Sequence, residues 1–242
     1  NGPFFLGERP YYCDFSAYSD IAIGAAKIMG YNLIQNFNLP YLSKSIGEFW
    51  RRWHISLSTW FRDYLYIPLG GSKGGKWRSV RNIFVIFIVS GFWHGANWTF
   101  IMWGLIHALL YIPLFLKGKN RKYTTSVVAE NRWLPSFKEL FQMGFTFFTT
   151  MIAWVFFRSD TVENAFIYLF NLFIWLKIPS TNRYGLIYVI IIVICDWIMR
   201  HDEINVLKTN STVINWLIVL IVSVLFLSYS SYSPQQFIYF QF

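Results

Sequence analysis

The chain has 242 residues, of which 55% are hydrophobic and only 14% are charged, and a water-soluble domain of this length would have too little polar surface for that composition. The formal net charge is +9, but the basic residues gather in short segments between apolar runs, as in cytoplasmic loops, and form no surface suited to nucleic acid. We therefore predict an integral membrane protein with membrane lipid as its main surroundings. Cys13 and Cys195 lie far apart in the sequence, so neither a disulfide framework nor a metal site is indicated.

The N-terminal segment, residues 14–30, is moderately apolar but contains charged side chains. Asp20 and Lys27 are seven residues apart and would share one face of a helix. We expect that face to point into the protein or a hydrated cavity, and a structural ion pair or contact with lipid headgroups is the alternative. Because the chain starts at Asn1 without a signal-like segment, we interpret it as a fragment preceded by further membrane spans.

Residues 45–66 carry too many charges to cross a bilayer, but a helical projection separates them into two faces. Large aromatic and aliphatic side chains fill one face, and Arg51, Ser58 and Arg62 lie on the other. This pattern predicts one amphipathic helix at the membrane interface or the edge of a cavity. His54 falls on the boundary between the faces, where an imidazole can meet both aromatic packing and a polar substrate.

Residues 69–76 form a glycine-rich break that superficially suggests a phosphate-binding loop. Gly70, Gly75 and Lys76 have the required separation, but Trp77 stands where such a loop carries Ser or Thr. No strand is predicted before it. We expect a flexible basic loop on the cytoplasmic side instead.

Residues 82–97 form an apolar run that is interrupted by a polar turn around His94. If Arg81 marks one membrane face, thirteen helical residues place His94 roughly 20 Å along the helix axis, within the hydrocarbon layer. Glycines at 91 and 95 allow the helix to break or to pack closely there. Loss of water favours a neutral imidazole, which can accept a proton as a general base. A buried structural histidine is the alternative, and Asn97 is a candidate to orient the ring or line the pocket.

The remaining apolar runs predict further membrane helices. Credible spans are Trp98–Leu116, 140–157, 184–199 and 213–232, whereas 162–176 is shorter. We expect His107 to make an interhelical hydrogen bond and His201 to lie in a solvated loop. The predicted fold class is all-α: a multi-pass transmembrane helical bundle with an interfacial amphipathic helix and a broken or re-entrant helix near the active site.

Several motifs resemble the membrane-bound O-acyltransferase family, and particularly its alginate O-acetyltransferase branch. They are EFWRRWHISLSTWFRDY at 48–64 followed by IPLGG at 67–71, DFSAYSDIAIG at 14–24, FWHGANWT at 92–99, and the ending FIYFQF. The resemblance is strong over residues 11–110 and rests mainly on hydropathy beyond them. Cys13 departs from the branch, which commonly has an aromatic residue there, and the N-terminal half of the family is absent.

The resemblance implies that His94 is the catalytic residue and that His54 is a second active-site position. Around them we select Trp93, Asn97, Arg51, Ser58, Arg62 and Asp20 as candidate substrate-binding residues. The family resemblance also implies that residues 1–242 are the C-terminal part of one membrane domain. No bound cofactor and no metal are expected.

The same resemblance implies the reaction and its setting. The acyl donor would be acetyl-CoA or another acyl thioester, and the acceptor would be a hydroxyl of an exported or cell-surface polysaccharide. A partner acetyltransferase or acyl carrier would relay the group, in the cytoplasmic membrane of a bacterium. Basic residues of 51–81 would attract donor phosphates. Two alternatives remain: D-alanyl transfer to teichoic acid by the related branch, and a non-catalytic transporter or scaffold.

Overall fold

The computed structural model describes residues 11–123, 127–175, 193–201 and 212–229. Contacts divide the chain into one compact unit, Phe15–Ser180, and a second made of Asn1–Asp14 and Thr181–Phe242. Every regular element in the described ranges is helical, which confirms the all-α class. The elements within or reaching into the larger unit are α1 (Tyr11–Ile28), η1 (Pro40–Leu42), α2 (Ile46–Arg52), α3 (Ile55–Phe61), the π-helical turn η2 (Arg62–Tyr66), α4 (Lys76–His94), α5 (Trp98–Leu116), α6 (Phe137–Arg158) and α7 (Val162–Trp175).

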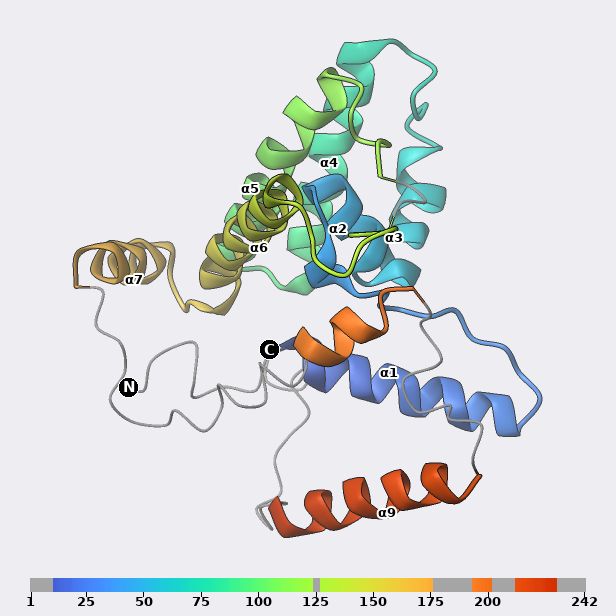
Figure 1. The fold of residues 1–242 in the computed structure, drawn as a ribbon. Coiled ribbons are helices and arrows are strands. Elements are labelled where there is room, and N and C mark those ends of the chain that lie inside the picture. Colours follow the sequence, from blue (N-terminus) through green and yellow to red (C-terminus); the bar gives the residue numbers. More distant parts are fainter. Residues whose placement is uncertain (1–10, 124–126, 176–192, 202–211, 230–242) are drawn as a thin grey trace. The chain divides into compact units, whose positions relative to one another are not determined.

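Among the described residues of this unit, two helices are long and apolar enough to cross a bilayer, α5 and α6 (Figure 1). The bounds of α5 are those predicted from the sequence, and α6 extends the predicted 140–157 by a few residues at its N-terminal end and one at its C-terminal end. The first turn of α6 is closed by a capping box between Ser136 and Glu139, which accounts for the earlier start. The shorter run predicted at 162–176 is α7, which has 14 residues.

Helices α4 and α5 pack against each other through glycine. A Cβ atom on Gly91 would lie 2.3 Å from the carbonyl oxygen of Phe100, and one on Gly104 would lie 2.2 Å from that of Phe87. Only glycine lets the two backbones approach this closely. Gly91 thus serves close packing and does not break the helix: α4 continues through Gly91 and ends at His94.

The expectation of one continuous helix over residues 45–66 is wrong. Helix α2 ends at Arg52, and His54 takes a left-handed backbone conformation, with φ 44° and ψ 56°, before α3 begins at Ile55. A helical projection assumes the same rotation at every residue, so it cannot register this single reversed residue. The break turns the imidazole of His54 away from the position that a continuous helix would give it.

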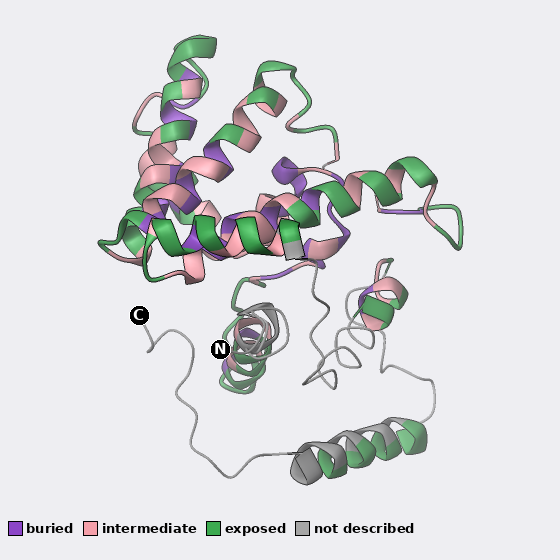
Figure 2. Ribbon diagram, turned by 90° about the vertical axis from the view of Figure 1, so that its left-hand side faces the viewer, coloured by how far each residue is buried: buried purple, intermediate pink, exposed green. Residues whose placement is uncertain are grey.

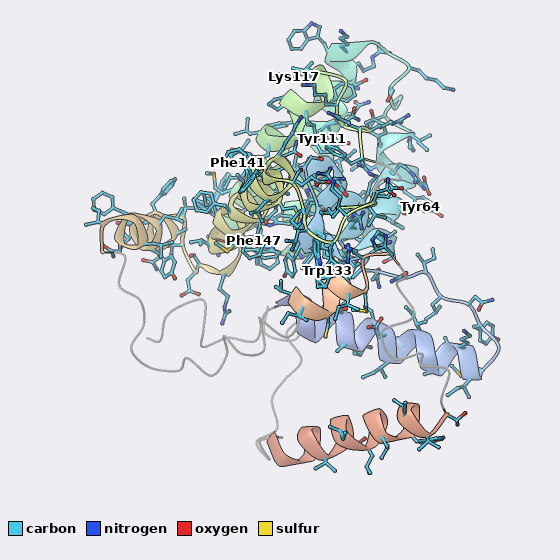
Figure 3. The ribbon with its side chains drawn as sticks, viewed as in Figure 1. Tyr64, Tyr111, Lys117, Trp133, Phe141 and Phe147 are labelled. Atoms are coloured by element: carbon cyan, nitrogen blue, oxygen red, sulfur yellow. The ribbon has the colours of Figure 1, made fainter. Side chains whose placement is uncertain are left out.

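Exposed apolar side chains cover much of α6. Phe141, Phe145 and Phe148 are all exposed, and Figure 3 shows Phe141 and Phe147 on this helix. Figure 2 shows exposed, intermediate and buried residues interspersed along the helices of the larger unit. An exposed apolar face of this kind suits contact with lipid or with further helices.

The smaller unit contributes two described stretches beyond residues 11–14. Residues 193–198 are helical, and α9 (Thr212–Tyr229) follows after a gap. The predicted run 213–232 is thus helical as far as Tyr229. Most of the predicted run 184–199 lies outside the described residues. His201 is exposed, as expected.

Candidate active site

His94 is the last residue of α4 and lies in an aromatic setting. Its ring makes edge contacts with Trp93 and with Phe157 of α6, each at a centroid distance of 4.9 Å, and with Trp103 of α5 at 5.3 Å. Phe100 lies farther away, at 6.3 Å. Three helices therefore surround this imidazole, which is largely removed from solvent.

The backbone around His54 is held by Asn36, in the segment between α1 and α2. The carbonyl oxygen of Asn36 accepts a hydrogen bond from the backbone N–H of Ile55, and its side-chain oxygen accepts from Ser56 N and Oγ. The Asn36 amide in turn donates to Ser19 on α1, at 3.4 Å. The bonds to Ile55 and Ser56, directly after His54, stabilise its left-handed conformation.

The His54 side chain packs edge-on against Phe15 of α1, with ring centroids 4.8 Å apart. Its Nδ1 atom is buried and has no hydrogen-bond partner among the described residues. Burial lowers the pKa of the imidazole to about 4. His54 is therefore neutral near neutral pH and has a nitrogen available for a ligand.

The fold brings the two histidines together. They are 40 residues apart in the sequence, yet they lie close enough in space for a charge on the His54 imidazole to affect that of His94. One comes from the turn before α3 and the other from the end of α4. Two neutral imidazoles in an aromatic, water-poor setting can accept a proton from one reactant and hydrogen-bond another.

His107 has a different environment. It is fully buried, and its Nδ1 accepts a hydrogen bond from the indole N–H of Trp50, at 3.3 Å. The ring also makes edge contacts with Trp50 and Trp103, each at 4.9 Å. The interhelical hydrogen bond predicted for His107 is thus confirmed.

Asn97 and Trp93 flank His94 on the chain. The side-chain oxygen of Asn97 caps α5 by accepting from Thr99 N at 3.1 Å, and its amide donates to the carbonyl oxygen of Asp160 at 2.9 Å. Asn97 thereby ties the turn after His94 to the turn between α6 and α7. Trp93 is 51% exposed, so part of its ring is available to a ligand beside His94.

Arg51, Ser58 and Arg62 lie on three different elements. The guanidinium of Arg51 donates to the carbonyl oxygens of Asn120 and Tyr123, at 2.7 and 3.1 Å. The Ser58 hydroxyl donates to the Trp53 carbonyl oxygen, and Arg62 pairs with the adjacent Asp63 on the surface. The described partners of all three side chains are thus other residues of this chain.

The outer charges of the predicted site are exposed in the described part of the chain. Asp20 and Lys27 are both exposed on α1. Lys73, in the glycine-rich segment before α4, and Lys76 and Arg78, in the first turn of α4, are exposed as well. These three exposed cations can attract an anion to this end of α4.

The sequence did not indicate two walls of the site. Trp103, which is 3% exposed, and Phe157 both contact the ring of His94. Trp103 lies one helical turn after Thr99 and one turn before His107 on α5. The spacing shows that the three residues share one face of α5, but it does not reveal that this face meets His94.

The amino-acid sequence was compared with known proteins. Residues 8–117 match the membrane-bound O-acyltransferase family. That segment contains both histidines, and the resemblance noted in the sequence is confirmed. The matched segment ends one residue after the C-terminal end of α5.

Bacterial relatives match beyond this segment. A protein named probable alginate O-acetylase from Pseudomonas syringae is 46% identical over 169 residues, covering 68% of this chain and 30% of its own length. A peptidoglycan O-acetyltransferase of Helicobacter pylori is 42% identical over 155 residues, 64% of this chain and 28% of its own. A teichoic acid D-alanyltransferase of Bacillus subtilis is 40% identical over 142 residues, 55% and 34% of the two lengths. The chain thus spans about a third of the length of these relatives.

Proposed function

We propose that the protein containing this chain is an O-acyltransferase that moves an acyl group, in the first place acetyl, to hydroxyls of an exported or cell-surface polysaccharide. The observation that carries the proposal is the juxtaposition of His54 and His94, within the segment that matches the acyltransferase family. Two of the three relatives named above are named for O-acetylation, of alginate and of peptidoglycan, which supports acetyl as the group. The donor is acetyl-CoA or another acyl thioester.

In the proposed reaction His94 is the general base. Its neutral imidazole takes the proton of the acceptor hydroxyl while the hydroxyl oxygen attacks the thioester carbonyl carbon. The resulting tetrahedral intermediate collapses with cleavage of the C–S bond, and the imidazolium returns its proton to the departing thiolate. His54, with its unpartnered Nδ1, positions or polarises the reactants.

The proposed architecture lets donor and acceptor meet from opposite sides of the cytoplasmic membrane of a bacterium. A multi-pass bundle is completed by spans outside this chain, and the break after His94 is a re-entrant point at membrane depth. A coenzyme A thioester carries phosphates that cross hydrocarbon poorly, so only the acyl group needs to pass. The cations at 73, 76 and 78 form the cytoplasmic entry for those phosphates.

The other predicted residues line the acceptor and donor routes in this proposal. Trp93 and Asn97 flank the catalytic base, whereas Arg51, Ser58 and Arg62 lie on the elements around His54, and Asp20 lies on α1 one residue from Ser19. A partner acetyltransferase or acyl carrier completes the relay. Residues 1–242 then form the C-terminal part of one membrane domain.

The test is replacement of His94 by Ala in the full-length protein, with His201→Ala as the matched control at an exposed histidine. We expect His94→Ala to abolish acylation of the envelope polymer with unchanged membrane abundance, and His201→Ala to leave it intact. Retained acylation in His94→Ala would remove this residue from the mechanism. Solute movement without thioester cleavage would establish the transporter alternative.

D-alanyl transfer to teichoic acid is a second candidate, supported by the Bacillus subtilis relative. Both reactions need a thioester donor and a base, so the histidine pair does not separate them. Analysis of the ester-linked groups released from the envelope by mild alkali does. Acetate supports the first candidate, and alanine would replace it with the second.

A further inference from the structure

Three neighbouring turns of α5 bury polar atoms that lack a hydrogen-bond partner among the described residues. They are Thr99 Oγ1, Trp103 Nε1 and His107 Nε2, on side chains that are 1%, 3% and 0% exposed. The four-residue spacing places them along one face of the helix. Buried polar atoms are normally paired, so this line of three requires a physical explanation.

Trp103 is the member of this line that contacts the ring of His94. The two rings meet edge to face, at a centroid distance of 5.3 Å and an angle of 85°. Phe157 closes the same space, 5.4 Å from Trp103 and 4.9 Å from His94. A tryptophan ring whose N–H has no partner among the described residues therefore packs against the proposed base, in surroundings made mainly of aromatic rings.

An indole nitrogen can only donate a hydrogen bond. Its ligand must accordingly be an acceptor, and acyl transfer produces one at this position when the carbonyl oxygen of the thioester becomes an oxyanion. A fixed donor in a water-poor site stabilises such a charge more than it stabilises the uncharged carbonyl. Other tryptophans near the histidines are less suited, because Trp50 already donates to His107 and Trp93 is half exposed.

We propose that the Trp103 indole N–H donates to the acyl carbonyl oxygen and stabilises its negative charge in the transition state; this inference rests on the proposed function. When the hydroxyl oxygen bonds to the carbonyl carbon, the C=O π electrons move to the oxygen that Trp103 binds, and the hydroxyl proton passes to His94. On collapse those electrons re-form C=O, the C–S bond breaks, and the thiolate takes the proton from His94.

The test compares Trp103→Phe with Trp154→Phe in membranes that contain the full-length protein, acetyl-CoA and the native envelope polymer. Trp154 is an apt control because it is a packed tryptophan of α6 whose ring contacts include Tyr41 and Trp53. We expect Trp103→Phe to lower kcat about 100-fold or more, the effect of removing one oxyanion donor, with KM changed little. Trp154→Phe should keep kcat within a few fold of the wild type.

A kcat for Trp103→Phe equal to that of the control would overturn the inference. A lowered melting temperature with normal kcat would also overturn it, because that result indicates a structural water in place of the acyl oxygen. If Trp103→Phe fails to fold, benzothienylalanine at position 103 preserves the bicyclic shape and lacks the N–H, and the same kcat loss is expected. Absence of acylation by the wild-type protein would refute the proposed function itself. Acylation that survives both His94→Ala and Trp103→Phe would remove His94 and Trp103 from the mechanism, whereas loss in His94→Ala alone refutes only the role of Trp103.

Discussion

The contact between α4 and α5 gives the sharpest test of how the fold positions His94. Gly91 lies three residues before His94, and a Cβ atom there would be 2.3 Å from the Phe100 carbonyl oxygen. Ordinary carbon–oxygen contact needs roughly 3.2 Å or more, so Gly91→Ala must separate the helices locally by about 1 Å. Overpacking of this kind costs about 1–3 kcal/mol of stability.

The same displacement acts on the catalytic geometry. A shift of about 1 Å at a reacting group can lower the rate about 100-fold. We therefore expect Gly91→Ala to reduce both polymer acylation and the melting temperature of the detergent-purified full-length protein. Gly144→Ala on α6 is the matched control, since a Cβ atom there meets nothing within 4 Å. Wild-type acylation and melting temperature in Gly91→Ala would refute the close approach of α4 and α5.

Three further predictions concern the groups around the site. Trp50→Phe removes the donor to His107 and should destabilise the protein by about 1–3 kcal/mol; an unchanged melting temperature would argue against that hydrogen bond. Asn97→Ala removes the cap of α5 and should lower the free energy of unfolding by about 1 kcal/mol. Asn97→Asp retains the cap and should lose less stability; equal losses in the two variants would mean that the bond to Asp160 dominates. The pKa of His54 is about 4 in the folded protein, below its unfolded value of 6.5. Burial of this ring therefore lowers the free energy of unfolding as the pH falls from 6.5 toward 4, by about 2 kcal/mol at about pH 5. His54→Gln should lessen the fall in melting temperature between about pH 7 and pH 5, and an identical pH profile would contradict burial of the neutral ring.

Helix positions and the identity of the two histidines were predictable from local information. The bounds of α5 follow from an uninterrupted apolar run between Asn97 and Lys117, because length and hydropathy along one segment are properties of that segment alone. The end of α4 at His94 follows in the same way from the Gly95 that succeeds it. His94 and His54 were found through motifs that lie on consecutive residues.

Only the tertiary structure decided what these histidines contact. The left-handed turn at His54 depends on bonds from Asn36, a residue in a different segment, so a projection of residues 45–66 treated it as part of one helix. Trp103 and Phe157 became neighbours of His94 because Gly91 and Gly104 let α4 and α5 pack closely and α6 closes the space beside them. A sequence displays which side chains a helix carries, whereas the face that each helix turns toward a reacting atom is set by packing between helices far apart in the chain.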